Sequence, residues 1–263
     1  MNNLLRKIKF LASFTRDFIL GVSSEQAIAR MKVVLLKGKT WRYLRYIHAR
    51  NALSLAEDWK DILVVGAGNG FAEIALALEY PDKHFYLSDY ENATHSTLHA
   101  RALIKRYKIN NISFIDLNIL DKPERQYDIV YSVEVLEHIK DDVLAAHNML
   151  LSARKYIFCL VPFATPADNQ NKELRQRVLE THEHHVVGYN AEELSQFFID
   201  IVKIQGCYWT DAGVIFRKKL TAMSLNDIEC NIPELVNEAS LDIKDSIPTS
   251  LREALGIWIL AKV

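Results

Sequence analysis

Short apolar runs alternate with longer amphipathic stretches from about residue 60 to the end of the chain. The runs that predict strands are, in chain order, 61–65, 84–89, 111–117, 127–134, 155–162, 200–209 and 256–263. The stretches that predict helices between them are 70–80, 93–108, 141–151 and 191–199. Repeated strand–helix units with apolar strands predict a parallel sheet covered by helices on both faces.

The first 58 residues follow a purely helical pattern instead. Apolar residues three or four positions apart predict helices over 4–20, 24–36 and 40–57. We therefore expect a helical amino-terminal cap or lid over residues 1–58 and one α/β domain over residues 59–263. Within that domain, the long, polar and weakly periodic stretch at about 212–250 is interpreted as an insertion.

Charge is distributed unevenly along the 263 residues. Residues 1–50 carry eleven Lys and Arg against two Asp and Glu, whereas the rest carries 21 basic and 31 acidic residues. Such a basic segment can contact nucleic acid, an anionic membrane or an acidic substrate, or it can dock on the acidic body of its own chain or of a second copy. We favour docking, and we interpret the aromatic, basic stretch 37–50 as core and lid rather than a nucleic-acid surface.

The three cysteines, Cys159, Cys207 and Cys230, are scattered and fit neither a disulfide framework nor a metal-binding spacing. No apolar run approaches the roughly 20 residues that a membrane-spanning helix needs. We therefore expect a cytoplasmic protein. Membrane contact through the amino-terminal helix is a less favoured alternative.

Three glycines at every second position, Gly66, Gly68 and Gly70, follow the first predicted strand. Glycine there permits positive φ and lets a ligand approach the backbone at the start of a helix. A dinucleotide site would have the spacing G-x-G-x-x-G with a small last residue, but Phe71 occupies that position, so NAD and FAD are disfavoured. Asp89 ends the second predicted strand, where a carboxylate can accept hydrogen bonds from both ribose hydroxyls of a nucleoside.

These residues, together with "YDIVYSVEVLEHIKDD" (127–142), resemble the class I S-adenosylmethionine-dependent methyltransferases, most closely the small-molecule subgroup with a "VLEH" sequence. The resemblance covers about 60–205 and the last strand. It implies a Rossmann-like sheet of seven mostly parallel strands with the last one antiparallel, and S-adenosylmethionine as the cofactor. The cofactor-binding residues that it implies are Gly66, Ala67, Gly68, Gly70, Asp89, Tyr90, Asn118, Ile119, Ser132, Val133 and Glu134.

Asn118 stands where the family usually has an adenine-binding Asp, and Asp116 is the alternative if the register is shifted by two residues. A hydroxyl acceptor would need a base that works near pH 7, and histidine has a suitable pKa. The candidate catalytic residues are His138, His185 and Glu134, and a structural role for each histidine remains open. Tyr189, in a stretch that resembles the family's lid, is interpreted as a lid or packing residue.

The sequence "HEHH" (182–185) also allows a metal site, because two imidazoles so close in sequence can share an ion. No remote set of ligands is evident, so we expect a solvated or lid-side histidine cluster and no metal.

The sequence thus predicts methyl transfer to a small or medium-sized acceptor, with oxygen favoured. The alternative is a non-catalytic methyltransferase-like binding subunit whose partner interface is its basic amino-terminal helices. A base-methylation signature is missing after the fourth predicted strand, so a nucleic-acid substrate is disfavoured. Substrate choice is assigned to the cap, the loop at 163–176 and the insertion at about 212–250, which leave the acceptor and the oligomeric state open.

Overall fold

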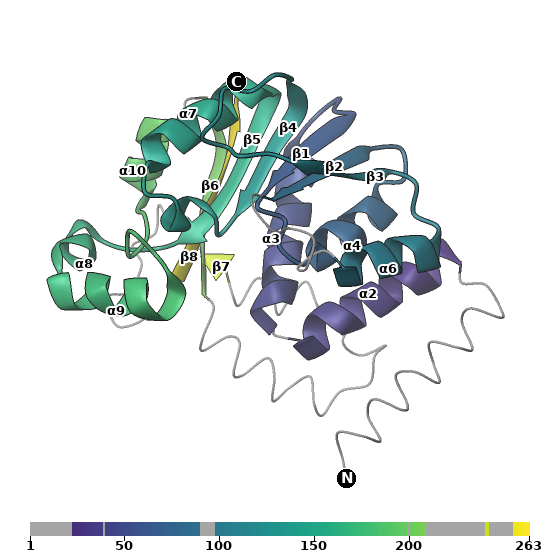
Figure 1. The fold of residues 1–263 in the computed structure, drawn as a ribbon, viewed down its shortest axis with the longest axis horizontal. Coiled ribbons are helices and arrows are strands. Elements are labelled where there is room, and N and C mark those ends of the chain that lie inside the picture. Colours follow the sequence, from purple (N-terminus) through teal and green to yellow (C-terminus); the bar gives the residue numbers. More distant parts are fainter. Residues whose placement is uncertain (1–22, 39, 90–97, 199, 209–239, 242–254) are drawn as a thin grey trace, which may run out of the picture.

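The structure is a computed structural model that describes residues 23–38, 40–89, 98–198, 200–208, 240–241 and 255–263 (Figure 1). The predicted helix at 4–20, Tyr90 and most of the predicted insertion lie outside the described residues.

A single mixed sheet forms the centre of the molecule. Its strands are β1 (Asp61–Val65), β2 (His84–Asp89), β3 (Ile112–Asp116), β4 (Tyr127–Val133), β5 (Ala153–Pro162), β6 (Ile201–Tyr208), β7 (Ser240–Leu241) and β8 (Leu255–Lys262). They lie in the order β3-β2-β1-β4-β5-β8-β6-β7. The first five strands are parallel, and β8 pairs antiparallel with both β5 and β6. The predicted seven strands and the antiparallel last strand are confirmed, and the two-residue β7 extends one edge.

Helices cover both faces of this sheet. They are α2 (Ser24–Gly38), α3 (Thr40–Leu55), α4 (Phe71–Glu79), α6 (Leu98–Tyr107), α7 (Asp142–Ser152), α8 (Pro166–Gln170), α9 (Lys172–His182) and α10 (Ala191–Phe197), with a 3₁₀ turn η1 (Leu136–His138). Figure 1 shows α2, α3, α4 and α6 on one side of the sheet and α7 and α10 on the other. No helix of the described residues is long and apolar enough to span a bilayer.

Alternation along the strands divides the core into two layers. In β1, Ile62 and Val64 pack with α2, α3 and α4, whereas Leu63 and Val65 pack with α7 and α10. Successive side chains of a strand point to opposite faces. A strand buried on both faces therefore appears in the sequence as the continuous apolar run that predicted it.

The segment after β5, predicted as a loop, is helical. Thr165 caps α8 in a capping box with Asp168, and Pro166 takes the first helical position. Asn171 caps α9 through hydrogen bonds from two backbone N–H groups. The capping residues, rather than an apolar stripe, define these helices, and a prediction based on apolar periodicity therefore misses them.

Two long-range hydrogen bonds fix α3 on the rest of the chain. The indole Nε1 of Trp258, in β8, donates to Nδ1 of His48 at 3.1 Å within the core. Burial lowers the pKa of His48 to about 4, so its imidazole is neutral and can accept this bond. The Tyr46 hydroxyl donates to Oε1 of Glu79, in α4, at 2.5 Å. These contacts make α3 part of the packed domain.

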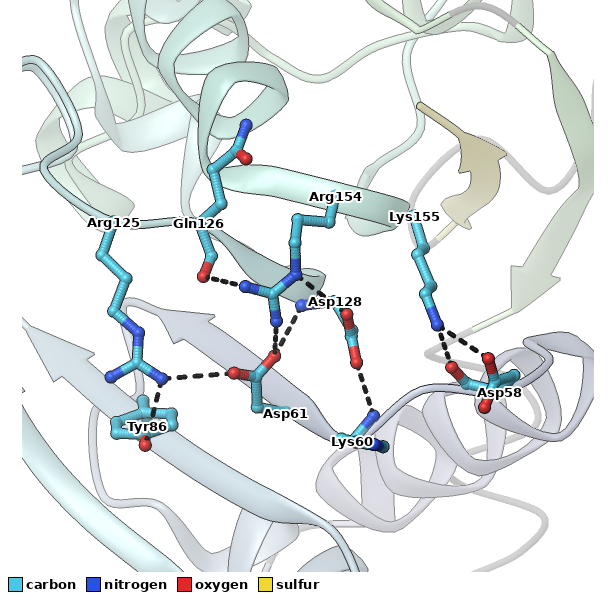
Figure 2. Close-up of polar contacts among 9 residues, drawn as sticks. All are labelled: Asp58, Lys60, Asp61, Tyr86, Arg125, Gln126, Asp128, Arg154 and Lys155. Atoms are coloured by element: carbon cyan, nitrogen blue, oxygen red, sulfur yellow. Dashed lines mark hydrogen bonds and ion pairs between the residues drawn. The ribbon is translucent and has the colours of Figure 1, made fainter.

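A charged network joins the beginnings of β1, β4 and β5 (Figure 2). Oδ1 of Asp61 accepts from the backbone N–H of Asp128 at 2.6 Å and from the Arg154 guanidinium at 2.7 Å. Arg154 also donates to Asp128 at 3.0 Å, and Arg125 donates to Asp61 at 3.2 Å. Since Asp61 and Asp128 are mostly buried, these bonds replace the water that the carboxylates lose on folding.

We expect Asp61→Ala to lower the free energy of unfolding by about 2 kcal/mol, because the Asp128 N–H and the Arg154 guanidinium lose their acceptor. Urea denaturation would measure the change. Asp58→Ala is the matched control, because that side chain is 91% exposed beside Lys155 and exposed pairs contribute little. Equal losses in both variants would contradict a special role for the network.

Candidate functional site

The loop between β1 and α4 is held in a left-handed backbone conformation at three positions. The φ angles are 65° at Gly66, 52° at Gly68 and 64° at Gly70. Residues with a Cβ adopt such angles at a cost of roughly 1–2 kcal/mol each. The conformation of the turn thus explains why three glycines alternate here.

The surroundings of these glycines differ. A Cβ on Gly66 would lie 2.5 Å from Val135, and one on Gly70 would lie 3.0 Å from Leu87. A Cβ on Gly68 would meet no atom within 4 Å among the described residues. The loop is therefore packed at both ends and open at its tip.

Asp89, at the end of β2, lies beside that tip. Its Oδ2 accepts a hydrogen bond from the backbone N–H of Gly68 at 3.2 Å, and Ala67 donates to the carbonyl of Ser88 at 2.8 Å. The structure therefore brings together the two features predicted from sequence, the glycine loop and the carboxylate at the end of the second strand. Both lie at the carboxyl edge of the parallel strands, where α/β folds bind ligands.

A cavity of about 270 Å³ opens next to this loop. Four parts of the chain line it: the cap helices, the glycine loop with the start of α4, the end of β4, and the turn that follows. The lining residues are Leu35, Arg45, Gly66, Ala67, Gly68, Asn69, Ala72, Glu73, Tyr131, Val133, Glu134 and His138.

Arg45 is a site residue that the sequence reasoning missed. It comes from α3 and forms an ion pair with Glu134, itself at a positive φ of 51° just after β4. The sequence pattern of 37–50 predicts core and lid residues. Its spacing does not indicate which basic side chain points into the site. Only the packing of α3 on the sheet identifies Arg45.

Buried carboxyl groups surround Arg45. Burial raises the pKa of Glu73, in α4, to about 7, although its own backbone, the Tyr131 hydroxyl and Arg45 act to lower it. Burial likewise raises the pKa of Glu137 to about 8, again partly offset by Arg45. With Glu134, the site holds three carboxyl groups and one guanidinium. This arrangement favours a cationic ligand, whose charge would stabilise the ionised carboxylates.

The candidate catalytic residues separate into two positions. Glu134 and His138 line the cavity, as the sequence analysis expects. His185 is exposed and is not among the described lining residues; its backbone N–H donates to the carbonyl of Glu137 at 2.7 Å. The neighbouring His184 instead brings its ring to His138, with the ring centroids 4.6 Å apart.

The remaining predicted cofactor residues lie at the same edge of the sheet. Asn118 and Ile119 follow β3, and neither belongs to the described lining of the cavity. Asp116, the alternative to Asn118, pairs in register with Asp89 across the two strands. Ser132 is buried in β4, and its hydroxyl has no partner among the described residues. These placements leave the adenine-binding assignments as predictions.

The comparisons with known proteins agree with this architecture. Residues 63–154 match the family model of a methyltransferase domain. No curated protein sequence matches the chain significantly.

Three solved structures share the fold. The YcgJ protein from Bacillus subtilis is 15% identical with a TM-score of 0.52, covering 82% of this chain and 98% of that one. Coclaurine N-methyltransferase, bound to N-methylheliamine and S-adenosylhomocysteine, is 12% identical with a TM-score of 0.54, covering 81% and 68%. Phosphoethanolamine N-methyltransferase 2 from Haemonchus contortus, in complex with S-adenosylmethionine, is 11% identical with a TM-score of 0.52, covering 92% and 60%. At these identities the likeness shows the fold alone.

Gly66 and Gly68 differ most in how closely other atoms surround them, so alanine substitutions at these two positions can be compared directly. We expect Gly68→Ala to cost about 1 kcal/mol of folding stability, because it adds only backbone strain. Gly66→Ala adds the same strain and a clash with Val135, so its cost should exceed 3 kcal/mol or prevent folding. Urea denaturation of both variants would measure the difference, and equal costs would contradict the close packing at Gly66.

The raised pKa of Glu73 predicts a dependence of stability on pH. Its protonated form is favoured in the folded state, so the stabilisation is complete below pH 4.5 and is lost as the pH rises through about 7. We expect the loss between these values to be roughly 3 kcal/mol. Glu73→Gln, which stays neutral, should flatten the decline measured by urea denaturation at pH 5, 6 and 7, apart from the contribution of Glu137. An unchanged slope would contradict the assignment.

Proposed function

We propose that this chain, which carries a methyltransferase domain with the class I fold, transfers a methyl group from S-adenosylmethionine to a small or medium-sized acceptor. One observation carries the proposal: the left-handed glycine loop is open at Gly68, directly beside the carboxylate of Asp89. A loop of this kind at the end of the first strand suits a nucleoside ligand, with the sugar at the acidic residue.

The residues of the cavity fit this cofactor. Its volume of about 270 Å³ is close to the lower end of the usual range for small-molecule sites. Glu73 and Glu134 lie next to the glycine loop, and a positively charged sulfonium there would favour the ionised form of the buried Glu73. When bound, the cofactor supplies a methyl group that its positively charged sulfur has already activated. The S-adenosylhomocysteine and S-adenosylmethionine in two structures of the same fold support this choice of ligand.

The task left to the protein is to position the acceptor and exclude water, because proximity supplies much of the rate of such a transfer. Glu134 and His138 line the cavity and are the residues we assign to the acceptor side. For an oxygen acceptor, His138 or His185 would receive the hydroxyl proton. A cytoplasmic location remains an expectation from the sequence.

We expect S-adenosylhomocysteine to bind the full chain with micromolar affinity, and Asp89→Ala to weaken binding at least tenfold through the loss of charge-assisted hydrogen bonds to the ribose. Isothermal titration calorimetry would measure both. Asp58→Ala, an exposed carboxylate near the start of β1, should bind as the wild type does. Absence of binding to the wild type, or equal affinity in Asp89→Ala, would contradict the proposal.

A transfer assay separates an enzyme from the alternative, a binding subunit. We expect label from methyl-labelled S-adenosylmethionine to appear on small molecules of a protein-free cell extract when the wild-type chain is added, and not when no chain is added. Asp89→Ala should transfer less in proportion to its weaker binding. Binding of the cofactor without any transfer would favour the binding subunit.

A further inference from the structure

Nothing in the described part of the chain explains why the carboxyl group of Glu137 is buried. Its side chain is fully buried, and neither oxygen has a hydrogen-bond partner among the described residues. A buried carboxyl group without a donor or a counter-ion is kept protonated, is paired, or holds a metal ion. The one arginine in the cavity lining, Arg45, forms its ion pair with Glu134.

Two imidazoles converge on this carboxyl group. Glu137, His138 and His184 each offer one ligand atom, and these three atoms all lie within 4.8 Å of one another. The His138 and His184 rings are nearly perpendicular, at 89°. Nδ1 of His184 is buried and has no hydrogen-bond partner among the described residues.

The backbone explains why residues so far apart in sequence meet. The 3₁₀ turn after β4 carries Glu137 and His138, while His184 follows the end of α9. Glu183 ends that helix in a left-handed conformation, with φ at 60°. Two residues further on, the backbone N–H of His185 donates a hydrogen bond to the carbonyl of Glu137 at 2.7 Å. This bond joins the two segments directly beside the cluster.

We propose that Glu137, His138 and His184 bind a divalent transition-metal ion such as Zn²⁺ or Mn²⁺. Two imidazole nitrogens and one carboxylate oxygen suit these ions better than Mg²⁺ or Ca²⁺, which prefer all-oxygen sites. Ligands at about 2.1 Å from an ion lie roughly 3.5 Å apart, so small side-chain rotations would complete the site. An ion there would favour the ionised form of Glu137 in its buried position.

This proposal departs from the expectation of no metal. That expectation rested on the absence of a remote ligand set for "HEHH" (182–185). In the fold, Glu137 and His138 supply such a set, and His184 rather than His185 is the histidine that reaches them.

The position of the ion would also restrict the acceptor, a point that rests on the proposed function. His138 lines the cavity as well as belonging to the cluster, so the ion would lie at the cavity wall. A metal ion lowers the pKa of a hydroxyl that it binds. The acceptor class is then a molecule with an ionisable hydroxyl.

Metal binding can be tested without any measurement of activity. The full chain would be stripped with a chelator and titrated with Zn²⁺ by calorimetry, and with Co²⁺ by visible absorption. We expect one equivalent to bind, and both Glu137→Gln and His184→Ala to weaken binding at least tenfold. His147→Ala is the matched control, because His147 is an exposed imidazole on α7 outside the cluster.

The outcomes separate this inference from the proposed function. No binding to the wild type, or equal weakening in His147→Ala, would overturn the metal site. If Glu137→Gln fails to fold, His184→Ala decides, because that side chain is only partly buried. S-adenosylhomocysteine binding by the stripped protein is measured in parallel. If the protein binds Zn²⁺ but does not bind S-adenosylhomocysteine, the proposed function is overturned and the metal site is not.

Discussion

The contact between Gly66 and Val135 fixes the geometry of the whole carboxyl edge of the sheet. Val135 lies so close to Gly66 that a Cβ there would be 2.5 Å away. The loop after β1 therefore packs directly against the loop after β4. Because Glu134 precedes Val135 and η1 follows it, one packing contact holds the glycine loop, the ion pair with Arg45 and the histidine cluster in a common frame.

The electrostatics of the site follow from the charged groups that lie close together at this edge of the sheet. Glu73, Glu134 and Glu137 gather around a single guanidinium, that of Arg45, in surroundings where burial raises the pKa of two of them. Such a site favours a positively charged ligand over a neutral or negative one. The same excess of carboxyl groups is thus consistent with a sulfonium at the glycine loop and with a metal ion at Glu137.

The central strands β1, β4 and β5 could be predicted almost residue by residue because they are buried on both faces and appear as continuous apolar runs. The glycine loop and Asp89 could be predicted because local spacing and strand ends define them. Arg45 and His184 could not, because their roles depend on how α3 packs in the fold and on where the chain after α9 meets the turn after β4. His184 and His185 are adjacent in sequence, and it is the His184 ring that lies beside His138, while the backbone N–H of His185 bonds to Glu137.

The contacts of α3 argue that this helix is a fixed wall of the cavity. Arg45 and His48 lie three residues apart, on neighbouring positions of one helix face. His48 is bonded to Trp258 in the core, and Tyr46 is bonded to Glu79 of α4. Moving α3 to admit a ligand would break both bonds and separate Arg45 from Glu134. Helix α3 is therefore as much a part of the site as the glycine loop, although the two lie on opposite sides of the boundary that the sequence pattern predicts at residue 58.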